Sequence, residues 1–229
     1  MPWFAASPNI TDSGIINFTD VDLSGPFYRL CQHHPHDVDL TGAVNAAVQF
    51  LAVGQVITET YTVTLNDGNG GIVNRTVLVT ITGTNDIPVI GVEDLAGAVV
   101  EDAASPNITD SGIINFTDVD LSDAHSASAV FVSTTHSVQL GTLSASITTP
   151  ATGGATGAVT WNFSVTNAAV QFLAVGQVIT ETYTVTLSDG NGGIVNRTVL
   201  VTITGTNDIP VIGVEDLAGA VVEEVNITD

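Results

Sequence analysis

Hydrophobic and polar residues alternate along several stretches of this 229-residue chain. The clearest alternation runs through 157–165, 178–187 and 193–205. A period of two predicts β-strands with one buried face. Shorter apolar runs, bounded by turn residues, add further strands at 97–102, 112–118, 126–133 and 138–147. We therefore expect an all-β, antiparallel sandwich. Its core should include Trp161, Phe163, Tyr183, Val185, Val199 and Val201.

Two connecting segments of this pattern have their own signals. The stretch SDGNGG at 188–193 joins two alternating runs, and its Gly and Asn residues favour a hairpin loop. The stretch 167–177 is the one piece that could form a helical turn. We expect it to cap the sandwich, with Val170, Phe172 and Leu173 facing inward.

The chain repeats itself almost without change. Residues 7–24 recur 98 positions later at 105–122, and residues 45–101 recur 122 positions later at 167–223, with Asn66 replaced by Ser188 as the single difference. The unit is therefore 122 residues long, and the first copy lacks 24 of them between Ser24 and Asn45. We divide the chain into a first repeat at 1–86 with a deletion near 25–44, a complete repeat at 87–208, and the start of a third repeat at 209–229.

The damaged region of the first copy holds the most unusual residues of the chain. Cys31, His33, His34 and His36 cluster there, which by composition suggests zinc, copper or a reactive thiol. However, one codon choice for FVSTTH at 131–136, read from its third base, encodes Cys-Gln-His-His-Pro, which are residues 31–35 in order. We therefore interpret about 25–40 as an out-of-frame version of the repeat. We expect 25–44 to be an irregular loop without a metal.

Composition narrows the possible functions. The chain has 24 acidic residues, three arginines and no lysine, which gives a formal charge of −21 and argues against a nucleic-acid partner. Its hydrophobic share of 44% argues against disorder. The sequence contains no run of 18 or more apolar residues, so we expect no membrane insertion. The first residues lack the pattern of a secretory signal, so export would use another signal or the sequence is a fragment.

Four motifs in order carry a family resemblance: FTDVDLSDAH, GAVTWNFSVTNAAVQFLAVGQ, YTVTLSDGNGG and VTITGTNDIPV. Together they resemble the bacterial VCBS repeat, a cadherin-like module of large secreted or surface proteins, many of them adhesins. They cover the whole second copy, and the first apart from its gap. The resemblance implies tandem cadherin-like or Ig-like sandwiches with a structural or adhesive role outside the cell.

The likeness to cadherins also implies calcium between the repeats. At the first junction the matching residues are the linker pair Asn85 and Asp86, followed by Asp118, Asp120 and Asp189. At the next junction they are Glu101, Asn207 and Asp208. Neither set is complete, because the first copy has no counterpart of Glu101 and the third has no Asp-x-Asp, so we expect weak binding in the range of about 10⁻⁴–10⁻³ M. The alternative is that these residues only form turns and caps.

No position repeated in both copies places a nucleophile beside a base, so we expect no enzymatic activity. His125 and His136 lie in the segment that the first copy lacks, and we expect both at the surface. The expected partners are neighbouring repeats and an unidentified receptor on a cell surface or matrix. The alternatives are an accessory stalk of a larger secreted hydrolase and a sugar-binding sandwich, although Trp161, the one aromatic platform of the complete unit, should lie in the core.

Overall fold

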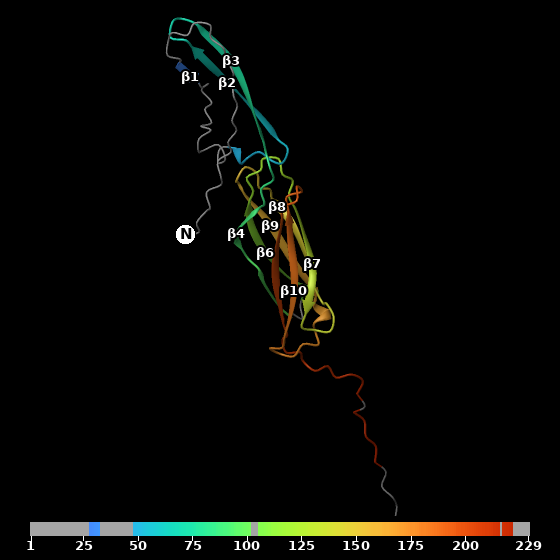
Figure 1. Cartoon of the computed structure of the whole chain (residues 1–229). Helices are drawn as coiled ribbons and strands as arrows, with labels where there is room; N and C mark the ends of the chain where they lie inside the picture. The colour runs from blue at the N-terminus through green and yellow to red at the C-terminus, as the bar shows by residue number, and fades with distance from the viewer. Residues whose placement is uncertain (1–27, 33–47, 102–104, 216, 222–229) are drawn as a thin grey trace, which may run out of the picture.

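The computed structural model describes residues 28–32, 48–101, 105–215 and 217–221 (Figure 1). The elements with described bounds are strands and one short 3₁₀ helix, η1. The first repeat holds β1 (Tyr28–Gln32), β2 (Val56–Asn66) and β3 (Ile72–Thr82). The complete repeat holds β4 (Val89–Glu93), β5 (Ala96–Val100), β6 (Asn107–Thr117), β7 (Ser126–Thr134), β8 (Thr142–Thr149), β9 (Thr156–Thr166), η1 (Asn167–Ala169), β10 (Val178–Ser188) and β11 (Ile194–Thr204).

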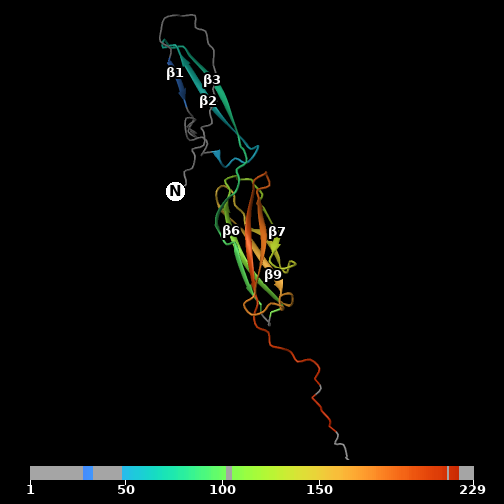
Figure 2. The ribbon, with the colours of Figure 1, turned by 60° about the horizontal axis from the view of Figure 1, so that its bottom comes forward.

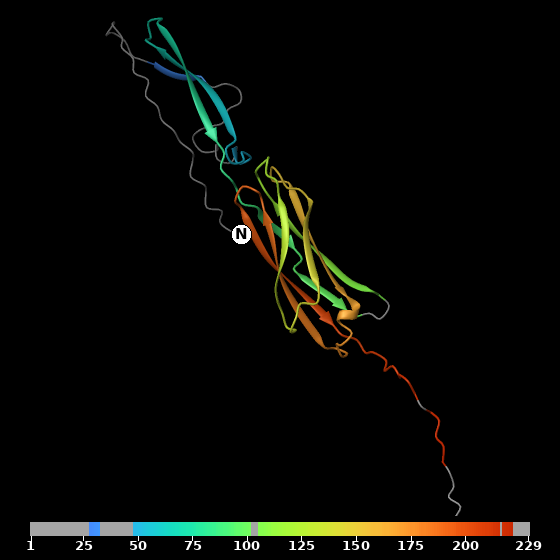
Figure 3. The same ribbon diagram turned by 90° about the vertical axis from the view of Figure 1, so that its right-hand side faces the viewer.

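The complete repeat is a sandwich of two four-stranded sheets, which face each other in Figure 3. One sheet has the strand order β5-β11-β10-β7 and the other has the order β4-β6-β9-β8. The hairpin β10–β11 pairs over its full length, from Val178 opposite Thr204 to Ser188 opposite Ile194. The expected all-β sandwich is confirmed.

One strand pair departs from a purely antiparallel arrangement. The chain leaves the first sheet after β4, which pairs antiparallel with β6, and enters the second sheet as β5 without reversing direction. Because it does not reverse, β5 runs parallel to β11, from Ala96 opposite Leu200 to Val100 opposite Thr204. At the crossing, the carbonyl oxygen of Asp94 accepts a hydrogen bond of 2.7 Å from the indole Nε1 of Trp161. This bond ties the crossover to the core.

The core lies between the two sheets of the complete repeat, as the alternation predicts. All six residues expected there are buried: Trp161, Phe163, Tyr183, Val185, Val199 and Val201. Trp161 needs a glycine opposite it on β6, because a Cβ at Gly112 would lie 2.5 Å from its Cζ2. The large indole therefore fits only because the neighbouring strand carries no side chain at that point.

The cap over the end of the sandwich is partly as expected. η1 and the turn after it bury Val170 and Leu173, but Phe172 is 53% exposed and lies beside His136, with ring centroids 5.0 Å apart. The inward prediction for Phe172 is wrong, because the tight turn directs only one side of this segment inward. No helix in the described ranges is long and apolar enough to cross a membrane.

Substitution of Phe172 should therefore have a small effect. We expect Phe172→Ala to lower the free energy of unfolding by less than about 1 kcal/mol, because half of the ring is already in water. Leu173→Ala is the matched control and should cost about 2–5 kcal/mol, since Leu173 is buried. Urea unfolding of the two variants gives the comparison. Equal losses would mean that Phe172 is part of the core.

The described part of the first repeat forms one three-stranded sheet in the order β1-β2-β3. The expectation of an irregular loop over 25–44 is wrong for residues 28–32, which form β1. Tyr28 of β1 pairs with Asn66 of β2. The equivalent pair in the complete repeat is Ser126 of β7 with Ser188 of β10. β1 therefore takes the place of β7, because β2 and β10 share their sequence and offer the same backbone edge. The side chain of Cys31 and the residues His33, His34 and His36 lie outside the described part.

The sheet of the first repeat is less covered than its copy in the complete repeat. Tyr61 and Val79 are half-buried, whereas their copies Tyr183 and Val201 are fully buried. Among the residues described there, the buried hydrophobic ones are Val48, Leu51, Ala52 and Ile81, and three of them, Val48, Leu51 and Ile81, form a small cluster. The same residues therefore make a tight core in one copy and a loose one in the other.

Candidate metal centre

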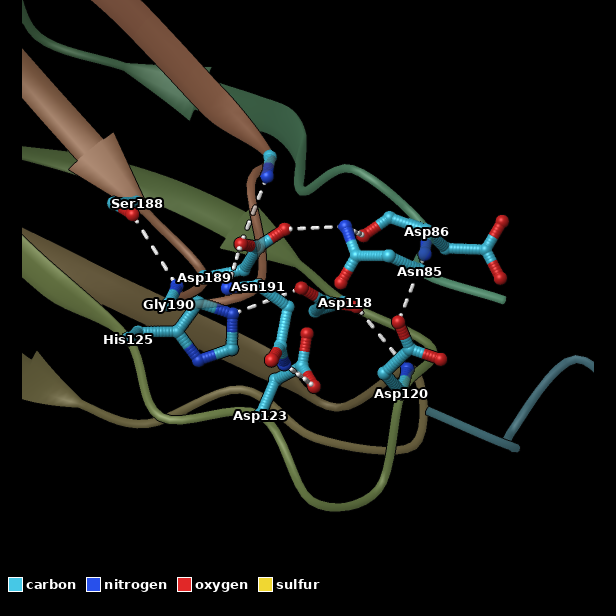
Figure 4. Close-up of polar contacts among 11 residues, drawn as sticks. Asn85, Asp86, Asp118, Asp120, Asp123, His125, Ser188, Asp189, Gly190 and Asn191 are labelled. Carbon is cyan, nitrogen blue, oxygen red and sulfur yellow. Dashed lines mark hydrogen bonds and ion pairs between the residues drawn. The ribbon is translucent and has the colours of Figure 1, made fainter. Parts of the chain in front are cut away.

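Three segments that are distant in sequence meet where the first repeat joins the second (Figure 4). They are the linker at 85–86, the loop at 118–125 between β6 and β7, and the hairpin at 189–193 between β10 and β11. They meet because β6 and β10 end on the same side of the sandwich, toward the first repeat. Each segment contributes Asp or Asn side chains to the junction.

Hydrogen bonds attach the linker to the second repeat. The backbone N–H of Asp86 donates to Oδ2 of Asp120 at 2.8 Å, and the side-chain amide of Asn85 donates to Oδ2 of Asp189 at 2.8 Å. A third bond joins the repeats, from the N–H of Leu121 to the carbonyl oxygen of Phe50 at 3.1 Å. Two polar contacts to aspartates and one backbone hydrogen bond therefore connect the repeats at this junction.

Asp118, Asp120 and Asp123 are the centre of this junction. All three are buried, and each offers an oxygen atom within 4.8 Å of those of the other two. Calcium takes oxygen ligands at about 2.3–2.6 Å, so two ligands on opposite sides of one ion lie about 5 Å apart. The spacing of the three carboxylates therefore suits a single hard cation between them.

Several buried oxygen atoms in the junction have no hydrogen-bond partner. They are Oδ1 of Asp120, Oδ2 of Asp123 and Oδ1 of Asn85. A buried carboxylate oxygen without a partner is costly, and such atoms in native proteins call for an explanation. A cation bound by these oxygens would supply the missing partner.

The electrostatics show the same excess of negative charge. Burial raises the pKa of Asp86, Asp120 and Asp123, and neighbouring aspartates raise each of them further. Burial also tends to raise the pKa of Asp189, but hydrogen bonds from Asn85, Asn191 and Gly193 outweigh it and lower this pKa below the usual value. The carboxylates that lack enough donors would therefore be stabilised in their ionised form by a positive charge.

Arginine does not provide that charge in the described structure. Arg197 bonds Glu93 at 2.7 Å, and Arg75 bonds the carbonyl oxygen of Asn74 at 2.9 Å. Among the described residues of the junction, the basic side chain is His125, whose Nε2 lies 2.9 Å from Oδ2 of Asp118. The His125 side chain is 1% exposed and lies against Phe116, so the expectation of a surface histidine is wrong. Its position follows from Asp118, which needs a buried partner.

Of the predicted ligands, the junction brings together the side chains of Asn85, Asp118, Asp120 and Asp189 (Figure 4). Asp86 takes part through its backbone N–H, which bonds Asp120, while its carboxylate points away from the other aspartates. The junction also contains residues that the sequence analysis missed: Asp123, His125 and Asn191, whose side-chain amide donates to Asp123 at 2.6 Å. Asp123 and His125 have Gly25 and Phe27 at the matching positions of the first copy, so a search restricted to repeated residues passes over them. The short spacing of Asp118, Asp120 and Asp123 was the available signal.

The remaining predicted ligands lie at the other end of the complete repeat. Glu101 is buried, and its Oε2 accepts a bond of 2.9 Å from the N–H of Thr206, while its Oε1 has no partner. Asn207 and Asp208 follow on the exposed linker. These three residues therefore lie away from the first junction, and their role at a second junction stays a prediction.

Comparisons with known proteins give distant structural similarities only. No protein-family model matches the chain, and no curated protein matches its sequence. Mouse clustered PcdhgC3 EC1-3 aligns with 68% of this chain and 44% of its own, at 13% identity and a TM-score of 0.36. Zebrafish RET cadherin-like domains 1 to 4 align with 67% of this chain and 34% of their own, at 10% identity and a TM-score of 0.33.

A bacterial adhesin is similar at the same level. The enterotoxigenic E. coli adhesin CfaE aligns with 70% of this chain and 60% of its own, at 13% identity and a TM-score of 0.35. This chain thus spans less than two thirds of each of these structures. At such TM-scores the matches add nothing to the fold, which rests on the strand pairing described above.

Proposed function

We propose that this chain is a structural or adhesive module of a secreted or cell-surface protein, built from tandem VCBS-like sandwiches and held at its junctions by calcium. The observation that carries the proposal is the buried set Asp118, Asp120 and Asp123, whose oxygens converge and are only partly satisfied. The site joins one repeat to the next, which suits a role in fixing their relative orientation. Its expected partners are neighbouring repeats and a receptor outside the cell.

The proposed role is a non-catalytic one. In the described residues, the buried His125 contacts Asp118 through Nε2, and its Nδ1 has no hydrogen-bond partner. No hydroxyl or thiol is therefore placed for activation by this histidine. The sugar-binding alternative loses its aromatic platform, because Trp161 is fully buried.

The chain contains a matched pair of aspartates for testing calcium binding. In Asp189, Oδ1 accepts the N–H groups of Asn191 and Gly193 at 2.8 and 2.9 Å. In Asp67, its copy in the first repeat, Oδ1 accepts those of Asn69 and Gly71 at 2.7 and 2.8 Å. The two residues form the same turn, but only Asp189 lies at the junction. Asparagine can retain these turn contacts while removing the charge.

We expect calorimetric titration of the 229-residue chain at neutral pH to show one calcium ion bound at the junction, with a Kd of about 10⁻⁴–10⁻³ M. Asp189→Asn should weaken binding about tenfold or more, because affinity depends on the number of charged ligands. Asp67→Asn should leave the Kd unchanged. If the two variants have the same Kd for calcium, or if the unaltered chain binds no calcium, these acidic residues only form turns and keep the surface soluble.

A further inference from the structure

A hollow of about 470 Å³ lies on the sheet β4-β6-β9-β8, in the part formed by β6, β9 and β8. β9 is the central strand of these three, and Figure 2 shows it together with β6. The hollow lies near the start of β6, whereas the aspartates of the junction follow the end of that strand. Its volume is within the range of about 300–1,000 Å³ that is typical of ligand sites. The hollow is therefore large enough for a small ligand and is separate from the candidate metal centre.

Alternation along the strands determines which side chains face the hollow. Of the residues that line it, Leu143 and Phe163 are 9% and 1% exposed, so their side chains point into the core. Asp110 also points inward, because its Oδ2 accepts the N–H of Ala98 in the other sheet at 2.7 Å. The outer face is formed by six small side chains that carry hydroxyl or amide groups: Thr109, Ser111, Thr142, Ser144, Asn162 and Ser164.

The pairing register arranges these six side chains in two rows across the three strands, Thr109–Ser164–Thr142 and Ser111–Asn162–Ser144. Neighbouring members of a row are about 5 Å apart, and the two rows are roughly 7 Å apart. Hydroxyl and amide groups both donate and accept hydrogen bonds. The two hydroxyls on β8 lie 3.5 Å from the carbonyl oxygens of Ser164 and Asn162, at the limit of a hydrogen bond. They can therefore exchange these long contacts for shorter ones with a ligand.

The lining of the hollow disfavours several kinds of ligand. Among the described residues that line it, Asp110 is the charged one, and its carboxylate oxygens accept the N–H groups of Ala98 and Ser111, so a cation finds no free charge. The formal charge of −21 repels anionic ligands such as nucleic acids and acidic polysaccharides. An apolar ligand would meet only small polar side chains. The chemistry that remains is an uncharged ligand rich in hydroxyl groups, and neutral oligosaccharides have this character.

We propose that this hollow binds a neutral oligosaccharide through hydrogen bonds, with Asn162 as the central contact. Asn162 is exposed in the middle of its row on β9, and its side-chain amide offers two donors and one acceptor. No aromatic ring among the described lining residues faces the hollow, so the sugar gains no stacking. The expected Kd is therefore about 1 mM. Such binding gives the proposed adhesive role a receptor chemistry and does not rest on calcium at the junction.

The sequence of the first repeat provides no second hollow of this kind. Asn162 and Ser164 belong to the stretch TWNFSVT at 160–166, which is absent between Val44 and Asn45. We therefore expect one oligosaccharide to bind per molecule. Complete repeats in tandem would add one weak site each, and such sites reach a high combined affinity on a surface that carries many copies of the same sugar.

Titration of the ¹⁵N-labelled 229-residue chain with maltohexaose, laminarihexaose and mannohexaose, followed by two-dimensional NMR, tests the proposal. At least one of these neutral hexamers should shift the backbone resonances around the hollow on β6, β8 and β9. A galacturonic acid hexamer has a similar length but carries negative charges, and it should cause no shifts. Removal of calcium with EDTA should leave the Kd for the sugar unchanged, because the hollow is separate from the junction.

Two exposed asparagines of the complete repeat give a matched pair of variants. Asn162→Ala removes the central donors and acceptor of the hollow and should raise the Kd about fivefold or more. Asn196 is also exposed on a strand, but on β11 in the other sheet, where its Oδ1 accepts the hydroxyl of Thr186 at 2.8 Å. Asn196→Ala should change the Kd by less than about twofold, because this residue does not line the hollow.

Several results would overturn the proposal. It fails if none of the three neutral hexamers shifts the resonances of the hollow, if the galacturonic acid hexamer binds equally well, or if the two asparagine variants have the same Kd. It also fails if EDTA abolishes binding, since calcium at the junction would then hold the sugar. Dimerisation of the unaltered chain that Asn162→Ala abolishes, without any shift on addition of sugar, would instead assign the hollow to a contact between two copies. Sugar binding by a chain that binds no calcium would support the hollow and refute only the metal centre.

Discussion

Saturating calcium is expected to raise the unfolding midpoint of the complete repeat by about 10 °C. A ligand present at 100 times its Kd adds about 2.7 kcal/mol of stability, and each kcal/mol shifts a domain of this size by about 4 °C. The stabilisation arises because the ion neutralises Asp118, Asp120 and Asp123, which are buried together. Fluorescence of the buried Trp161, in a Trp3→Phe background that removes the other tryptophan, reports this transition directly.

The control for this shift removes charge from the centre of the site. Asp118→Asn combined with Asp120→Asn should abolish the effect of calcium, because the remaining carboxylates no longer surround an ion. Small-angle scattering of the unaltered chain should also show less bending between the repeats when calcium is present. If Mg²⁺ and Na⁺ raise the midpoint as much as Ca²⁺, the effect is screening of like charges and no specific site exists.

Glu181→Ala is expected to lower the free energy of unfolding by about 3–5 kcal/mol, which is typical of removing one partner from a buried polar cluster. Glu181 is fully buried on the apolar face of β10. Its Oε1 accepts the N–H of Leu140 at 2.6 Å, and its Oε2 accepts the N–H of Gly141 at 3.2 Å and the hydroxyl of Tyr183 at 2.7 Å. Alanine would leave the two N–H donors without acceptors.

The acidic control in the same repeat is Glu93, which is about a third exposed and bonds Arg197 at 2.7 Å. Glu93→Ala should cost less than about 1 kcal/mol, because exposed ion pairs contribute little. Urea unfolding of both variants gives the comparison. Similar losses would mean that Glu181 owes its burial to the strand pattern alone and does not hold the β7–β8 loop in place.

Burial raises the pKa of Tyr183, and so do its hydrogen bond to Glu181 and the charge of that residue. The same pair in the first repeat, Tyr61 and Glu59, raises the pKa of Tyr61 to about 12 for the same reasons. The motif therefore keeps the phenol protonated and able to donate in both copies. In the complete repeat, Glu181 also accepts the loop N–H groups of Leu140 and Gly141.

The alternation of the sequence was sufficient to predict which residues form the core. A period of two places Trp161, Tyr183 and Val199 on the inward faces of their strands, and this does not depend on which strands pair with each other. All three residues are buried. The same rule places Glu181 inside, but it cannot show how a buried carboxylate is satisfied. That depends on Leu140 and Gly141, 41 and 40 residues away in the chain.

Other features depend on contacts that no local pattern contains. β1 forms because the edge of β2 offers backbone groups to any extended segment, so its side chains gave no signal of a strand. The parallel pairing of β5 depends on the chain crossing between sheets, which is a property of the whole fold. Asp123 and His125 reach the junction because the loop after β6 returns to Asp118, and repetition within the chain hid their importance.

The parallel pairing of β5 with β11 also determines how the complete repeat carries mechanical load. In a chain pulled from both ends along its length, tension enters through β4 and β5 and leaves through β11. Since β5 and β11 point the same way, these forces slide the two strands past each other, and the bonds from Leu95–Leu200 to Glu101–Thr204 are loaded together. An antiparallel terminal pair would instead peel apart one bond at a time. The crossover after β4 thus gives the complete repeat a shear-resistant clamp between β5 and β11.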